Sequence, residues 1–129
     1  MCPQTNYDLA RYRLDKAEEC LDDAKLAFEH NALSTAANRS YYCIFHAMRA
    51  VLALDEFDSK KHSGIISAFN QRYVKTGIFP KSFSEISKRA FMIRGQSDYD
   101  DFYLVSKSEV EAQIKDAQTF LDAVKEHIG

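Results

Sequence analysis

The stretch 39–49 holds side chains whose types and spacing could act on a phosphate ester. Four of them recur at intervals of three, four and three residues, which places them on one face of an α-helix: Arg39, Tyr42, His46 and Arg49. Arg39 and His46 lie roughly 10 Å apart along a helix axis, at about 1.5 Å per residue. Both can therefore contact one phosphate-sized group or one partner surface, but they cannot bond to each other.

An arginine and a histidine in this arrangement are sufficient for metal-independent cleavage of RNA. The histidine can move a proton to or from the 2′-hydroxyl or the leaving oxygen, and the arginine can stabilise the charge that develops on the phosphoryl group. The alternative is structural: Arg39 pairs with an acid on a neighbouring helix, and His46 forms a hydrogen bond within the protein. The spacing alone is compatible with both.

Two other stretches add candidate binding residues. Arg94 is followed by Asp98 and Tyr99. The structural interpretation is an Arg94–Asp98 ion pair at i, i+4, and the functional one presents Arg94 to a ligand or a dimer cleft with Tyr99 beside it. Lys61 and His62 stand at the start of a predicted helix, where backbone N–H groups favour anions. The alternative for His62 is a capping or packing role.

The segment 60–94 is strongly basic although the whole chain has a net charge of −2. It contains eight Lys and Arg residues and one acid, Glu85, so its charge is +7 (8 − 1) and the rest of the chain carries −9. Such a segment could form a positive surface for phosphates or for an acidic partner. Alternatively, these charges spread over a solvated surface and are compensated by neighbouring helices.

Neither a metal site nor a cofactor is predicted. The four histidines stand at 30, 46, 62 and 127 without metal-binding spacing, and Cys43 with His46 would supply only two ligands. No glycine-rich phosphate loop is present. Cys43 carries no mark of an activated nucleophile, so we expect a buried thiol.

Length and composition predict one domain over 1–129. Hydrophobic residues make up 46% and charged residues 28%, as in an ordinary globular protein. Three cysteines without paired spacing indicate reduced thiols and hence a cytoplasmic protein. No apolar run approaches the roughly 20 residues of a membrane span, and residues 1–6 do not resemble a signal peptide.

Five amphipathic helices must position the candidate residues. Apolar residues recur at spacings of three and four over about 5–30, 33–54, 62–77, 82–95 and 106–128, and the fourth helix is expected to break around Gly95. The first has its charged face, Arg13 included, opposite the apolar seam. In the second, the buried face is predicted to be Ala37, Tyr41, Ile44, Met48 and Val51. The fold expected is an all-α, antiparallel four- to five-helix bundle.

Four motifs in series resemble the HEPN family, in its small stand-alone prokaryotic branch. They are 39–46 (RSYYCIFH), 61–64 (KHSG), 74–77 (VKTG) and 94–99 (RGQSDY), and the resemblance covers about 8–127. It implies a four- to five-helix bundle that often forms two-fold dimers. Many relatives in this family are metal-independent ribonucleases and toxins, paired with a minimal nucleotidyltransferase antitoxin.

The family's active motif is R-x4–6-H, two copies of which meet across the dimer cleft. In many such toxins it lies late in the chain, near Arg94, but here Tyr99 stands where a histidine would be. Arg39 to His46 is the literal match. The resemblance thus implies His46 as the acid–base group, Arg39 and Arg94 on phosphate, and Tyr42, Lys61, His62, Asp98 and Tyr99 as binding residues. The alternative is a non-catalytic module that binds a nucleotide or the nucleotidyltransferase.

Overall fold

The computed structural model describes residues 4–99 and 104–129, with side chains for 6–96 and 104–129. These residues form five α-helices and one π-helical turn, and no strand: α1 Gln4–Glu29, α2 Leu33–Ala53, α3 His62–Phe69, η1 Asn70–Val74, α4 Ser82–Tyr99 and α5 Lys107–Ile128. The predicted all-α bundle is confirmed. No helix in these ranges is both long enough and apolar enough to span a membrane.

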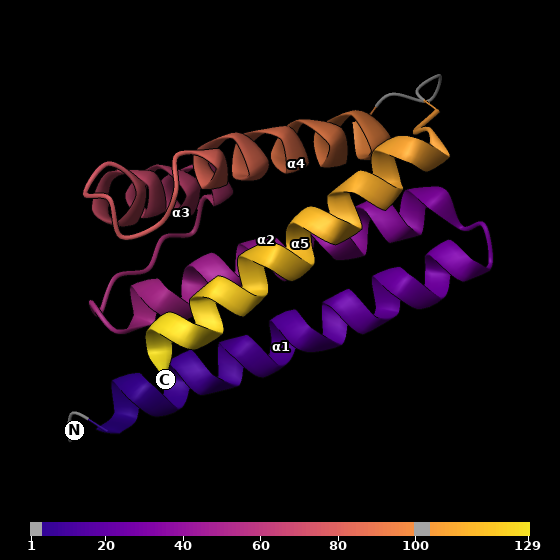
Figure 1. Ribbon diagram of the computed structural model, residues 1–129. Helices are drawn as coiled ribbons and strands as arrows, with labels where there is room; N and C mark the ends of the chain where they lie inside the picture. Colours follow the sequence, from indigo (N-terminus) through magenta and orange to yellow (C-terminus); the bar gives the residue numbers. More distant parts are fainter. Residues whose placement is uncertain (1–3, 100–103) are drawn as a thin grey trace.

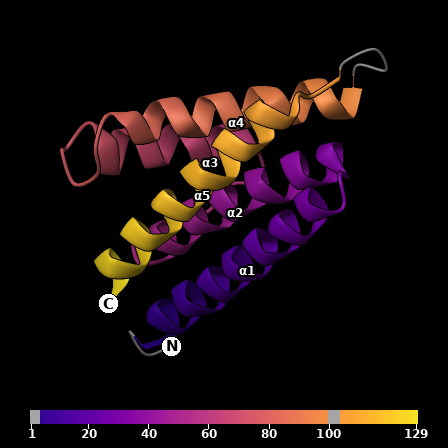
Figure 2. The ribbon, with the colours of Figure 1, turned by 45° about the vertical axis from the view of Figure 1, so that its right-hand side comes forward.

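Helix α2 is the central element, and all the other α-helices pack against it. Figure 1 shows α1 and α2 antiparallel on one side, α3 and α4 on the other, and α5 crossing in front of α2. The rotated view in Figure 2 keeps the same order, with α5 between α4 and α1. The two ends of the chain meet at one end of the bundle, where the Tyr7 hydroxyl donates to the Gly129 carbonyl (3.1 Å).

The composition of α2 explains its central place. Thirteen of its 21 residues are buried. The whole predicted inner face is solvent-inaccessible: Ala37, Tyr41, Ile44, Met48 and Val51. Several further buried positions are alanine, whose small side chain lets neighbouring helices approach closely: Ala36, Ala47 and Ala50. The polar stripe that begins at Arg39 is therefore left on the one side that no helix covers completely.

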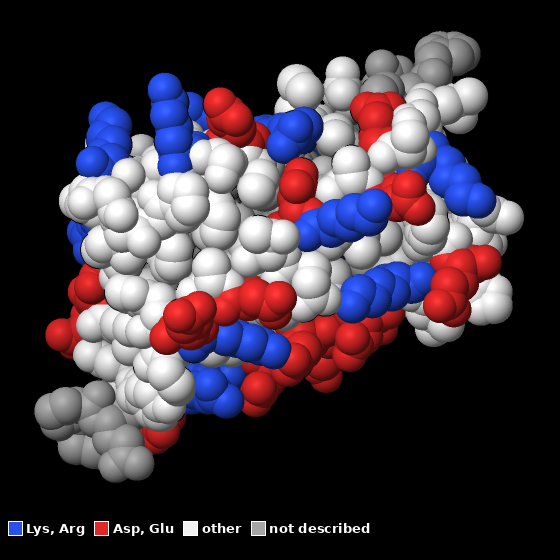
Figure 3. Space-filling view, viewed as in Figure 1, with Lys and Arg blue, Asp and Glu red and all other residues white. Residues whose placement is uncertain are grey.

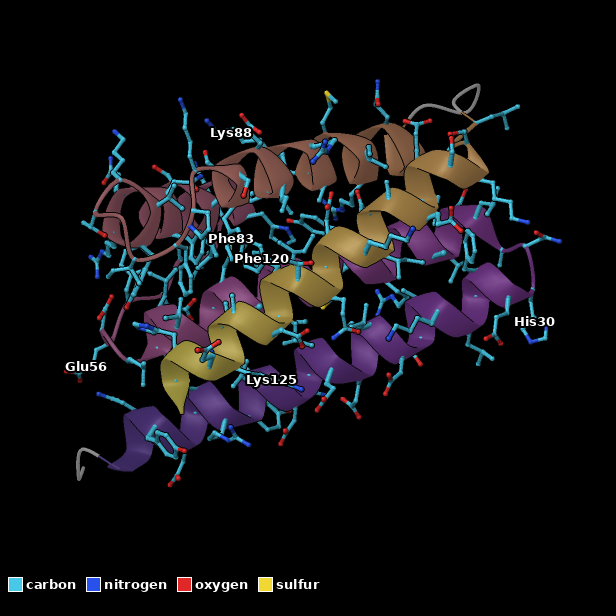
Figure 4. All side chains as sticks on the ribbon, viewed as in Figure 1. His30, Glu56, Phe83, Lys88, Phe120 and Lys125 are labelled. Atoms are coloured by element: carbon cyan, nitrogen blue, oxygen red, sulfur yellow. The ribbon has the colours of Figure 1, made fainter. Side chains whose placement is uncertain are left out.

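An aromatic layer joins α3, α4 and α5. Figure 4 shows Phe83 of α4 and Phe120 of α5 pointing toward one another, and their rings stack with centroids 4.6 Å apart. Phe69 of α3 lies against Phe120 (5.3 Å), and Phe79 stacks on both Phe69 and Phe83. These contacts fix α3 and α4, and hence His62 and Arg94, relative to the rest of the bundle.

The third predicted helix, 62–77, is interrupted. The α-helix ends at Phe69, a π-helical turn follows, and Gly77 adopts φ = 83° in the connection. The wider turn carries Tyr73 inward, where its hydroxyl donates to Asp55 Oδ2 (2.9 Å) and to the Val51 carbonyl (3.3 Å). These contacts are made with residues far away in the chain, so the local pattern could not predict them.

The prediction that the fourth helix breaks around Gly95 is wrong, because α4 continues to Tyr99. Glycine within a helix costs only about 1 kcal/mol relative to alanine, so tertiary packing can override it. Ile93 supplies that packing: it is buried in a cluster with Val105 and Val110, against Ala36 and Ala37 of α2.

The sequence pattern Ser106-x-x-Glu109 is typical of a capping box, and the structure forms one at the start of α5. Ser106 Oγ accepts from the Glu109 N–H (3.1 Å), and Glu109 Oε1 accepts from the Ser106 N–H (3.2 Å). We expect Ser106→Ala to lower the free energy of unfolding by about 1 kcal/mol. Urea denaturation measures this, with Thr119→Ala at an exposed position of α5 as the control. Equal losses in the two variants would contradict the prediction.

Candidate functional site

The polar stripe of α2 has α1 on one side, where Arg13 contacts Arg49, and α3 and α4 on the other, where His62 and Arg94 contact Tyr42. The ring of Tyr42 is at its centre. The Arg39 guanidinium lies over this ring at 5.1 Å, and that of Arg94 lies at 5.8 Å and donates to the Tyr42 hydroxyl (3.3 Å). The rings of His46 and His62 lie 5.9 and 5.8 Å away. Five predicted site residues from three helices therefore meet.

Arg39 does not form the ion pair that the structural interpretation predicts. Its Nε and Nη2 donate to Oδ1 of the adjacent Asn38 (3.0 and 2.6 Å), which is a neutral acceptor. Among the described residues, no carboxylate lies within ion-pair distance of Arg39. Its charge is therefore not compensated by a direct partner, and a phosphate could make that interaction.

His46 lines a groove of about 740 Å³ between α1 and α2, together with Arg39 and Arg49. Its Nδ1 is buried and makes no hydrogen bond to any described residue, unlike the bonded histidine of the structural interpretation. Burial, and to a smaller extent the charges of nearby cations, lower the pKa of His46 to about 4; these cations are Arg49, Lys16, Arg39 and Arg13. The imidazole is consequently neutral at neutral pH and able to accept a proton.

Arg13 was predicted to face solvent, but it is only 9% exposed. Its Nη1 donates to the Arg49 carbonyl (3.2 Å), and its Nη2 lies 3.5 Å from Asp58 Oδ2. Arg49 Nη2 approaches the same oxygen at 3.3 Å. The sequence does contain a local indication that Arg13 is buried, because Arg13 stands three residues after Ala10 and four before Ala17 of the apolar seam. No local signal exists for Asp58, which lies in the loop after α2.

His62 is the first residue of α3 and packs closely. Its ring stacks on Phe45 with centroids 4.1 Å apart, and its Nδ1 is hydrogen-bonded to the Tyr41 hydroxyl (2.6 Å). Burial lowers the pKa of His62, and the charges of Arg94 and Arg49 lower it further. This is the packing role considered as the alternative, and it holds the ring at the edge of Tyr42.

Of the remaining predicted site residues, only Lys61 has a described side chain, and it does not reach Tyr42. Lys61 is exposed at the N-cap of α3, and its backbone N–H donates to Ser59 Oγ (3.2 Å). Asp98 and Tyr99 belong to the last turn of α4, but their side chains lie outside the described residues. The predicted Arg94–Asp98 ion pair therefore stays a prediction.

The basic segment is partly compensated by other elements. Arg72 pairs with Asp55 (3.5 Å), and Arg89 pairs with Asp116 of α5 (3.3 Å). Figure 3 shows basic side chains projecting over α3 and α4, whereas acidic ones gather along the α1 edge. In Figure 4 Lys88 points away from the bundle. Across the middle of the face in Figure 3 the two signs are mixed, so the charge asymmetry of the sequence is only partly carried into space.

No group of three or more His, Cys, Asp and Glu side chains that could hold a metal ion occurs in the described part of the chain. Cys43 is buried, as predicted, and burial raises the pKa of its thiol. The imidazole of His46 and the guanidinium groups of Arg13, Arg39 and Arg49 share the groove with other polar groups: Tyr12, Lys16, Glu19, Cys20, Asp22 and Asp23.

Comparison with known proteins identifies the fold family. Residues 10–127 match the HEPN domain. A Thermotoga maritima protein named "UPF0332 protein" is 37% identical over 120 residues, which are 93% of this chain and 91% of that protein. A Methanocaldococcus jannaschii protein named "Putative toxin" is 32% identical over 112 residues, 87% of this chain and 83% of the relative. A second protein so named from that organism is 28% identical over 115 residues, 89% and 78% of the two chains. The protein therefore belongs to the HEPN domain family.

Proposed function

We propose that this HEPN protein is an endoribonuclease that binds RNA beside α2 and acts through His46, without a metal ion. The observation that carries the proposal is the neutral imidazole of His46 in a groove whose other basic side chains come from two helices. The contacts around Tyr42 add Arg94 from a third helix, because its guanidinium donates to the Tyr42 hydroxyl. Phosphate binding and proton transfer thus have candidate groups close together.

In the proposed reaction, the ribose 2′-oxygen attacks the adjacent phosphorus atom and the bond from phosphorus to the 5′-oxygen breaks. His46 takes the proton of the 2′-hydroxyl, and the leaving 5′-oxygen receives a proton from the imidazolium or from water. Arg39 and Arg94 stabilise the charge on the phosphoryl oxygens. The products are a 2′,3′-cyclic phosphate and a 5′-hydroxyl end.

The low pKa of His46 is compatible with this role because a bound phosphate would change it. Part of the lowering comes from the surrounding cations. A phosphate in the groove would oppose their charge and raise the pKa of His46 toward its ordinary value of about 6.5. Proton transfer would then be favoured when RNA is bound.

The test is incubation of the purified protein with a mixed RNA pool in EDTA. Fragments that carry 2′,3′-cyclic phosphate ends would support the proposal. If the folded protein binds RNA but leaves it intact, the function is the alternative, a non-catalytic module that binds a nucleotide or a nucleotidyltransferase. A steep fall of RNA affinity with salt would support phosphate contacts in either case.

We expect Arg94→Gln to weaken RNA binding about tenfold, the effect of losing one charge-assisted hydrogen bond. Fluorescence anisotropy with labelled RNA measures this in a variant that does not cleave. Arg89→Gln removes the same charge from α4 at a position paired with Asp116, away from Tyr42. Similar losses in both variants would contradict a specific role of Arg94.

We also propose that the protein is the toxin of a toxin–antitoxin pair. The names of the Methanocaldococcus relatives support this, and the partner we propose is a minimal nucleotidyltransferase encoded beside it.

A homodimer is proposed on two grounds, the incompletely covered stripe of α2 and exposed apolar side chains on α1: Tyr7, Leu9, Tyr12 and Leu26. A monomeric mass by light scattering at micromolar concentration would contradict the dimer.

A further inference from the structure

Two guanidinium groups converge on a single carboxylate oxygen beside the groove of His46. Arg13 Nη2 and Arg49 Nη2 lie 3.5 and 3.3 Å from Asp58 Oδ2. The arginine side chains are 11% and 26% exposed, whereas the Asp58 side chain is 54% exposed. The cations are therefore held by the bundle, and the anion reaches them from the surface.

The charges at this point do not balance. Arg13 and Arg49 together carry two positive charges and face one carboxylate. Lys16 also lines the groove, but it has its own acid within reach, Glu19 at 3.8 Å. Asp22 and Asp23 line the groove as well, but neither lies within ion-pair distance of Arg13 or Arg49. The mutual repulsion of the two arginines contributes, after burial, to a lowered pKa of Arg13.

The carboxylate of Asp58 is bound as a phosphate would be. Its Oδ1 accepts the Ser59 N–H (2.8 Å), and its Oδ2 faces both guanidinium groups. A backbone N–H and two arginines are also typical donors to phosphate oxygens. Phosphate offers more acceptor oxygens than a carboxylate, and a terminal phosphate also carries more negative charge, so it suits two arginines better.

Asp58 is placed so that it can leave. It lies in the loop between α2 and α3, and both of its arginine partners lie on helices. Burial alone would raise the pKa of Asp58, but the Ser59 N–H and the charges of Arg49 and Arg13 lower it overall. The group is therefore ionised at neutral pH and competes with other anions for the arginines.

We propose that Arg13 and Arg49 form a phosphate subsite, which Asp58 occupies in the free protein and leaves when a phosphate group binds. The proposal deepens the proposed function: the subsite lies beside His46, so it would hold a phosphate next to the one that reacts. The same chemistry could be supplied by an RNA strand or by the phosphate of a mononucleotide. The experiment distinguishes the two.

The experiment measures affinity in a His46→Gln background, so that no probe is cleaved. The probes are a fluorescently labelled 12-nucleotide RNA, AMP and inorganic phosphate, the latter two as competitors of the RNA and by isothermal titration calorimetry. Asp58→Asn should tighten binding about three- to tenfold, because the competing charge is removed. Arg49→Gln should weaken it about tenfold. Arg13→Ala is avoided, because Arg13 is buried.

The chain offers a matched control pair. Arg89 Nη2 and Asp116 Oδ2 are also 3.3 Å apart, but they join α4 to α5 and do not line the groove of His46. Asp116→Asn and Arg89→Gln therefore make the same changes of charge elsewhere. Circular dichroism shows whether each variant is folded, and the exposed loop position of Asp58 favours a folded variant.

Tighter binding by Asp58→Asn and weaker binding by Arg49→Gln, without matching changes in the controls, would support the subsite. If Asp58→Asn binds only AMP and inorganic phosphate more tightly, the result would support the subsite and overturn RNA as its ligand. Equal effects in the groove and control variants would overturn the subsite, as would failure of the Asp58→Asn variant to bind any of the three probes. If wild-type protein cleaves RNA while Asp58→Asn changes no affinity, the proposed function stands and this inference falls.

Discussion

Replacing His46 by glutamine is expected to slow RNA cleavage by a factor of about 10² to 10⁴, the usual contribution of a general acid–base group. Glutamine is similar in size and polarity but cannot exchange a proton near neutral pH. The imidazole lines the groove with Arg39 and Arg49, so its loss should remove proton transfer and leave the phosphate contacts in place. The measurement is single-turnover cleavage of labelled RNA by wild-type and His46→Gln proteins.

The loss should appear in the cleavage rate at saturating protein rather than in RNA affinity. In Figure 4 His30 points away from the end of α1, and it is exposed, so His30→Gln is the matched control. Equal rates for His46→Gln and wild type would rule out His46 as the acid–base group. A fall in affinity with an unchanged maximal rate would instead assign it a binding role and favour the non-catalytic module.

Acid is expected to destabilise the protein through His46. Burial and the nearby cations hold its folded-state pKa at about 4, below the ordinary value of about 6.5 expected in the unfolded chain. Between these two pH values the unfolded state binds more protons than the folded state, so stability falls as the pH drops from about 6.5 to about 4. The full gap corresponds to at most about 3 kcal/mol.

Urea denaturation at a series of pH values from 7 to 4, in steps of about half a unit, tests this expectation. His46→Gln should flatten most of the dependence over that range. A smaller dependence should remain, because burial also lowers the pKa of His62. An unchanged slope in the variant would contradict the low pKa of His46.

Addition of inorganic phosphate should raise the pKa of His46 measured by NMR, if an anion occupies the groove.

The sequence determined the parts of this protein that follow from short-range periodicity. Spacings of three and four residues are properties of one helix, so they predicted the inner face of α2 and the shared face of Arg39, Tyr42 and His46. The capping box at Ser106 was predictable for the same reason, because all its partners lie within one turn. The four motifs indicated the HEPN family over about 8–127, and the family match covers 10–127.

Only the tertiary structure decided which cations gather around α2. Arg94 meets Tyr42 across 52 positions in the chain, and Arg13 meets Asp58 because α1 and the loop after α2 lie side by side. The continuation of α4 beyond Gly95 likewise depends on the burial of Ile93 against other helices. The pKa of His46 depends on burial and on charges from two helices. Packing between helices sets the distances between these residues. A repeat of three or four residues within one helix holds no information about how that helix packs against others.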